Sequence, residues 1–104
     1  MPKYLLGYHG GTMPDGEAEQ AAVMAAWGAW FEQLGDAIVD GGNPTAAAKT
    51  VAADGSTTNG GGANPLTGYS ILQATDLDSA ATLAKGCPIL SDGGSVEVGE
   101  LVEM

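Results

Sequence analysis

Positive charge is almost absent from this chain of 104 residues. It has no arginine and only three lysines against 13 acidic residues, so the formal net charge is −10. Nucleic-acid binding requires clustered Lys or Arg, and bidentate Arg recognition of phosphate or carboxylate is impossible within this chain. The charge balance therefore argues against a nucleic-acid partner and favours a neutral or cationic small-molecule ligand.

Long apolar runs and cysteine pairs are also lacking. No apolar run approaches the 18 residues of a membrane span, so we expect no membrane association. The single Cys87 has no partner for an internal disulfide, which is typical of a reducing, cytoplasmic setting. One His, one Cys and scattered carboxylates show no zinc-site spacing, so the sequence predicts no metal and no cofactor.

Large apolar side chains are scarce as well. Leu, Ile, Val and Phe together make up 19 of the 104 residues, a fraction close to that of disordered chains. They are nevertheless grouped in blocks with regular spacing, and the shortage is concentrated in the Gly- and Ala-rich residues 41–67. We therefore expect one folded domain over 1–104 whose thin core is completed by a second copy of the chain.

The apolar blocks predict an alternation of strands and helices. A strand is expected over 3–9, a helix over 17–34 that ends at Gly35, and a short strand over 37–39. Asp54-Gly55 favours a hairpin turn between strands 49–51 and 56–58, and a loop over 59–64 follows. The chain is completed by a strand over 68–74, a helix over 77–84 with Thr75 as its N-cap, and a strand over 95–104.

This order, β-α-β-β-α-β with a small inserted hairpin, is the ferredoxin-like pattern of an α+β fold. Two right-handed crossovers place both helices on one face of the sheet and leave the opposite face uncovered. An uncovered sheet face that carries apolar side chains is a large exposed patch, and such patches usually contact a partner. We therefore expect a homodimer.

Several segments carry a family resemblance over nearly the whole chain. They are Tyr4-Leu5-Leu6-Gly7-Tyr8-His9, Trp27-Gly28-Ala29-Trp30-Phe31, Val39-Asp40-Gly41-Gly42-Asn43-Pro44, Gly68-Tyr69-Ser70-Ile71-Leu72 and Gly93-Gly94-Ser95-Val96-Glu97-Val98. With these segments the chain resembles the YCII-related (YciI-like) family. The resemblance implies a ferredoxin-like subunit that pairs into a dimeric α/β barrel and acts on a small molecule.

The resemblance does not extend to a catalytic pair. Related proteins combine a His in the first helix with an Asp at the end of the first strand. Here Val23 and Met24 occupy the helix positions, and the first strand ends in His9-Gly10. The pair is therefore not carried over to this chain.

The candidate chemical groups centre on His9, the only histidine, at the Gly-rich end of the first strand. As a general acid or base it requires an orienting carboxylate, for which Asp40 and Glu100 are the candidates. Tyr8 and Tyr69 are candidate hydrogen-bond donors to a ligand. Against this stands a structural interpretation in which His9 and Glu100 are strand-end residues and the tyrosines pack.

Two functions follow from these candidates. The first is a homodimer that binds a neutral small organic molecule and carries out proton transfer of the lyase or isomerase type through His9. The second is a non-catalytic module that senses a ligand or regulates a partner. A pocket that contains His9 and a carboxylate within hydrogen-bond reach would favour the first.

Overall fold

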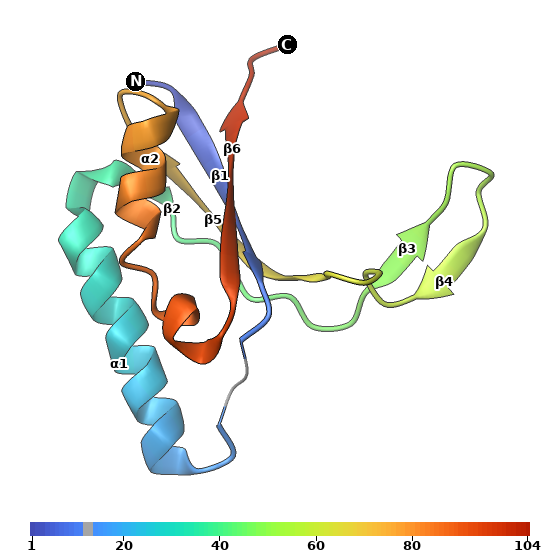
Figure 1. Cartoon of the computed structure of the whole chain (residues 1–104), viewed down its shortest axis with the longest axis horizontal. Helices are drawn as coiled ribbons and strands as arrows, with labels where there is room; N and C mark the ends of the chain where they lie inside the picture. Colours follow the sequence, from blue (N-terminus) through green and yellow to red (C-terminus); the bar gives the residue numbers. More distant parts are fainter. Residues whose placement is uncertain (12–13) are drawn as a thin grey trace.

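The computed structural model describes residues 1–11 and 14–104 of the chain. Its main sheet has the strand order β2-β5-β1-β6 (Figure 1), and every pairing in it is antiparallel. The strands are β1 (Lys3–His9), β2 (Ile38–Asp40), β5 (Leu66–Gln73) and β6 (Ser95–Leu101). Helices α1 (Glu17–Leu34) and α2 (Leu77–Ala84) connect them. The order and the antiparallel pairing confirm the predicted α+β fold of the ferredoxin-like type.

Several predicted boundaries shift by a few residues. The strand predicted over 37–39 lies at 38–40, because Gly35–Ala37 form a 3₁₀ turn, η1, after α1. The strand predicted over 68–74 begins at Leu66, which pairs with His9. The final strand, predicted over 95–104, ends at Leu101, because its neighbour β1 ends opposite it at Lys3.

The N-cap of α2 is Asp76, and the prediction of Thr75 is wrong. The carboxylate of Asp76 accepts the backbone N–H of Ser79 at 2.8 Å. This bond lowers the pKa of Asp76 below its usual range. The cap residue directly precedes the first helical residue, Leu77, so a helix that begins there requires its cap at position 76.

The core lies between the two helices and one face of the sheet. Tyr4, Leu6 and Tyr8 alternate along β1 and are buried on this face. Leu72 of β5 and Trp30 of α1 pack in the same core, and Trp30 donates its indole N–H to the carbonyl of Leu83 at 3.3 Å. A second 3₁₀ helix, η2 (Pro88–Asp92), closes one end of the core through the buried Ile89.

The opposite face of the sheet has no helix over it (Figure 1). The strand register places Leu5 beside Ile71 and Lys3 beside Leu101 on this face. Leu5 is 36% exposed and Leu101 41% exposed. We call this surface the helix-free face.

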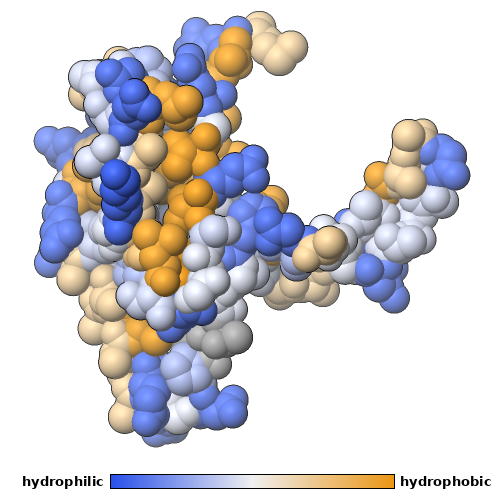
Figure 2. All heavy atoms as spheres, viewed as in Figure 1, coloured by the Kyte–Doolittle hydropathy of each residue, from blue (hydrophilic) through white to orange (hydrophobic). Residues whose placement is uncertain are grey.

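The inserted hairpin stands apart from the rest of the molecule (Figures 1 and 2). Its strands are β3 (Lys49–Val51) and β4 (Thr57–Asn59), which pair only with each other. The predicted return strand, 56–58, begins one residue later, because Ser56 belongs to the turn and its backbone N–H binds the carboxylate of Asp54 at 2.9 Å. We call residues 45–64 the arm.

Candidate functional site

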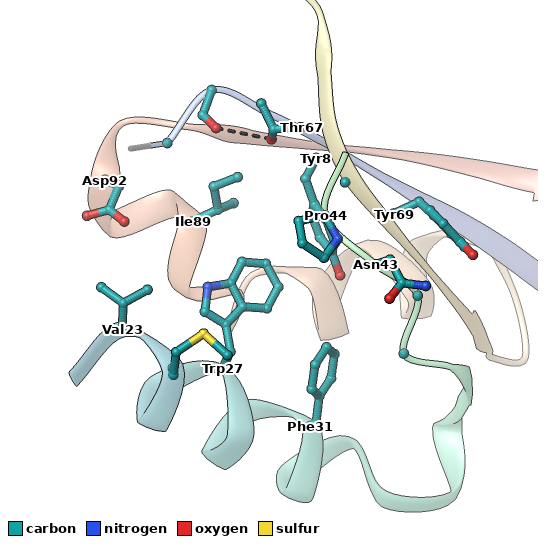
Figure 3. Close-up of a pocket in the computed structure, with 16 residues that line it drawn as sticks. Tyr8, Val23, Trp27, Phe31, Asn43, Pro44, Thr67, Tyr69, Ile89 and Asp92 are labelled. Atoms are coloured by element: carbon teal, nitrogen blue, oxygen red, sulfur yellow. Dashed lines mark hydrogen bonds between the residues drawn. The ribbon is translucent and has the colours of Figure 1, made fainter. Parts of the chain in front are cut away.

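A cavity of about 380 Å³ lies on the helix side of the sheet, next to α1 (Figure 3). One wall is formed by α1, and the others by the ends of β1 and β5, by η2 and by the loop 41–44 that follows β2. The α1 side chains in this wall are Val23, Met24, Trp27 and Phe31. The volume is within the range of ligand pockets, about 300–1,000 Å³.

Aromatic rings dominate the middle of this cavity. Trp27 packs edge-on against Tyr8, with ring centroids 5.0 Å apart and planes at 80°. Its centroid lies 5.9 Å from that of Phe31 and 5.8 Å from that of the buried Trp30. Edge-to-face pairs at these distances are favourable, so the cluster fixes the position of the half-buried Trp27. Trp30 thus anchors α1 in the core, whereas Trp27 presents apolar surface to the cavity.

A chain of hydrogen bonds connects the cavity floor to the loop after β2. The hydroxyl of Tyr8 donates to Oγ of Ser70 at 2.7 Å, and Ser70 donates to the carbonyl of Gly41 at 2.7 Å. The same loop is held by the carboxylate of Asp40, which accepts the N–H of Gly42 at 2.8 Å. Gly42 has a positive φ of 70°, which glycine adopts without strain. This part of the cavity wall is therefore a turn whose conformation is fixed by hydrogen bonds.

Tyr8 remains protonated in this position. Burial raises its pKa to about 12, although the hydrogen bond with Ser70 acts in the opposite direction. A phenol with such a pKa carries its proton throughout the neutral range. Tyr8 is therefore suited to hydrogen bonding and not to proton transfer.

The remaining polar groups of the cavity are few and lie at its margin. The hydroxyl of Thr67 donates to the carbonyl of Gly10 at 3.1 Å. Asn43 lies in the loop at one end, and the exposed Asp92 lies at the other end (Figure 3). Asp92 is the only ionisable side chain besides the tyrosines among the described residues that line the cavity. The lining suits an uncharged or cationic apolar molecule.

His9 does not line this cavity, because it follows Tyr8 in β1 and neighbouring strand residues point to opposite faces. Its Nδ1 lies 3.1 Å from the carbonyl of Asn64 and 3.2 Å from that of Pro65. Since both partners are acceptors, Nδ1 carries the proton in the neutral ring. Nε2 is buried, has no hydrogen-bond partner among the described residues, and lies 3.4 Å from a carboxylate oxygen of Glu97.

The structure does not bring the predicted carboxylates to His9. Asp40 lies on β2, and β5 lies between β2 and β1. The Asp40 carboxylate accepts the hydrogen bond from the N–H of Gly42. Glu100 pairs with Tyr4 near the other end of β1 and lies on the opposite face of the sheet from His9. The carboxylate that does lie beside His9 is Glu97, which is mostly exposed.

The two predicted ligand-binding tyrosines differ in their position relative to the cavity. Tyr8 lines the cavity with its buried ring. Tyr69 lies at the margin of the cavity, and its hydroxyl points away from it (Figure 3). Alternation along β1 already separates Tyr8 from His9 in the sequence. The separation of Tyr8 from Tyr69 depends on the register between β1 and β5, in which Tyr69 pairs with Gly7 and Tyr8 with Gly68.

Trp27 and the loop 41–44 are the site elements that were not predicted. Helical spacing does not distinguish Trp27 from Trp30, because both lie on the same apolar stripe of the helix. Trp27 and Trp30 are three positions apart, so their side chains differ in direction by about 300° around the helix axis, or about 60° the other way. Two residues of one apolar stripe can therefore have different contacts. The Gly41-Gly42-Asn43-Pro44 turn carries no side chain that marks it in the sequence as part of a binding site.

The described residues form neither a metal-ligand cluster nor a membrane-spanning helix. No group of three or more His, Cys, Asp or Glu side chains there is placed to hold a metal ion. Among the same residues, no helix combines the length and the apolarity needed to cross a membrane.

The fold and the site together define a ferredoxin-like α+β domain with an aromatic cavity beside its first helix. Residues 8–104 match the model of the YCII-related domain. The chain therefore belongs to the YCII-related family, as its sequence segments indicated. No curated protein matched the chain.

Proposed function

We propose that this protein binds a small, largely apolar organic molecule in the cavity beside α1, and that it does so as a homodimer. The aromatic cavity is the observation that carries the proposal. It combines the size of a ligand pocket with a rigid apolar lining and a few polar groups at its ends. Membership of the YCII-related family fits a small-molecule function.

Binding without catalysis is the form of this function that the cavity supports best. Its lining residues include neither the histidine nor a lysine or cysteine. Tyr8 keeps its proton because its pKa is raised to about 12. The ionisable group that remains, Asp92, lies at the exposed end, away from the aromatic cluster. A ligand-sensing role is therefore favoured over acid–base chemistry in this cavity.

One observation favours a second candidate, proton transfer by His9 on the helix-free face. The Nδ1–H is held by two backbone carbonyls, which fixes the ring and leaves the lone pair on Nε2. Nε2 is buried, and no residue in the part of the chain that the structure describes donates a hydrogen bond to it. A second subunit packed on the helix-free face would cover the mostly exposed Glu97 carboxylate beside this atom. His9→Gln, with an identified substrate, is expected to abolish turnover; unchanged turnover refutes this candidate.

The helix-free face supports the homodimer. It presents four apolar side chains along three paired strands: Leu66 opposite His9 at one end, Leu5 beside Ile71, and Leu101 opposite Lys3 at the other end. Leu66 is 51% exposed, and removing such side chains from water contributes about 25 cal/mol per Å² of apolar area. Packing two such sheets face to face at about 10 Å is a stable arrangement.

Ligand binding is testable with a neutral aromatic probe, 4-fluorobenzyl alcohol, followed by ¹⁹F NMR. We expect saturable binding to the wild type and at least tenfold weaker binding to Trp27→Ala. Leu77→Ala is the matched control, because Leu77 is a half-exposed apolar residue of α2 that does not line the cavity. This control should bind like the wild type. Absence of saturable binding, or equal binding by Trp27→Ala, refutes the proposal.

A further inference from the structure

The arm is the part of the molecule that the proposed ligand site leaves unexplained. Every residue from Thr45 to Asn59 is exposed. A two-stranded hairpin is at best marginally stable alone in water, because it has no second layer on which to bury its side chains. The radius of gyration, 14.9 Å, exceeds the value of about 13 Å that is typical of a compact chain of this length. The hairpin thus has no packing partner among the residues of its own subunit that the structure describes.

The root of the arm is nevertheless firmly attached. The backbone N–H of Thr45 donates to the carbonyl of Thr67 at 3.0 Å, and its hydroxyl donates to the carbonyl of Leu66 at 3.0 Å. On the returning side, His9 donates from Nδ1 to the carbonyls of Asn64 and Pro65. Both ends of the arm are tied to the sheet, so its direction is set by the fold.

That direction leads away from the helices. Figure 1 shows both helices on one side of the sheet, whereas the arm extends from the other side, beyond the helix-free face. The chain from Thr45 to Gly55 is ten residue steps long and spans up to about 33 Å when extended. A second sheet packed on the helix-free face would lie about 10 Å away. The arm is therefore long enough to pass the edge of that sheet and to reach its far side.

The arm carries no net charge that would oppose its contact with an acidic partner. Lys49 and Asp54 are its only charged residues, so the arm is neutral and the whole net charge of −10 lies in the rest of the chain. Two copies of so acidic a chain repel each other wherever their charged surfaces meet. A neutral arm with exposed Thr side chains and Val51, which is 68% exposed, approaches that surface without this repulsion.

We propose that the arm clasps a second copy of this chain, and that the two arms of the homodimer are exchanged symmetrically. This inference rests on the homodimer of the proposed function. Each arm would cover the side of the partner's sheet and gain the second layer that it lacks within its own subunit. The arm then serves as a dimerisation element.

The test compares dimer dissociation constants by sedimentation equilibrium. One variant replaces residues 46–63 with a short Gly-Ser linker. A second, Val51→Asp, keeps the arm and adds a charge to it. Val102→Asp is the matched control, because Val102 is a valine of similar exposure, 75%, outside the arm. We expect at least tenfold weaker dimers for the linker variant and for Val51→Asp, and an unchanged dimer for Val102→Asp.

The outcomes separate the two proposals. A wild type that is monomeric throughout the micromolar range refutes the homodimer and the clasp together. If the wild type is a dimer and both the linker variant and Val51→Asp have the same dissociation constant as the wild type, the clasp alone is refuted. Amide hydrogen exchange is a second readout, which stays informative if the linker variant fails to fold. We expect the amides of Val51 and Thr57 to lose protection on dilution below the dissociation constant; protection that does not change overturns the clasp.

Discussion

The hydrogen bonds between Tyr8, Ser70 and Gly41 permit a quantitative test of how the cavity wall is held. Tyr8→Phe removes one hydroxyl and leaves Ser70 still able to donate to the carbonyl of Gly41. The loss of one such bond costs about 1 kcal/mol of unfolding free energy. Ser70→Ala removes both bonds and leaves the buried Tyr8 hydroxyl without its acceptor. An unsatisfied buried group adds its desolvation penalty, so we expect a cost of about 2–3 kcal/mol.

The double variant carries the decisive comparison. With Phe at 8 and Ala at 70, no buried hydroxyl is left without a partner. The double variant should therefore lose at least about 1 kcal/mol less than the sum of the two single losses. The assay is urea unfolding followed by Trp fluorescence, at one protein concentration and at neutral pH. Equal losses for the two single variants, or a double loss equal to their sum, would refute the bonding described here.

Two further predictions concern the glycines and the pH dependence of stability. Gly42→Ala should lower the free energy of unfolding by at least about 2 kcal/mol, because Gly42 has a positive φ and the new Cβ would overlap the carbonyl oxygen of Tyr69. Gly28 lies in open space on α1, so Gly28→Ala should raise the free energy of unfolding by about 0.5–1 kcal/mol in the same urea assay. Burial raises the pKa of Cys87 to about 11 and that of Tyr8 to about 12, from ordinary values of 9.0 and 10.0. Both groups ionise more readily in the unfolded chain, so the stability that they contribute is present below pH 9 and is lost progressively up to pH 12. Urea titrations at successive pH values should show this loss of stability, and Cys87→Ala should remove the part of it that begins at the lower pH. A free energy of unfolding that stays constant between pH 9 and pH 12 contradicts the burial of both groups.

The elements that local chemistry specifies were predictable from the sequence. The helix 17–34 ends at Gly35, whose φ of 53° suits glycine, and its N–H binds the carbonyl of Phe31. The hairpin turn at Asp54-Gly55 is fixed by the φ of 88° at Gly55 and by the side chain of Asp54. In each case residues adjacent in the sequence determine the geometry, so no knowledge of distant contacts was needed.

The candidate site was harder to predict because it depends on contacts between distant residues. His9 was placed correctly at the end of β1, but its neighbours Asn64 and Pro65 come from the root of the arm, 55 and 56 residues away. The nearest carboxylate, that of Glu97, depends on the register between β1 and β6. Neither the path of a long polar insertion nor the register of a strand at the far end of the chain follows from local pattern.

An irregularity at the end of β1 determines which face each residue reaches. Tyr8 pairs with Gly68, but His9 pairs with Leu66, so Thr67 is an extra residue in β5. Such a bulge restarts the alternation of the bulged strand. If the same sequence paired regularly, Thr67 would lie opposite His9, and Leu66 would turn toward the helices. The bulge thus keeps Leu66 on the helix-free face while Thr67 stays beside the cavity. Deleting Thr67 would leave Leu66 opposite His9 and would remove only the cavity-lining threonine and its bond to the carbonyl of Gly10.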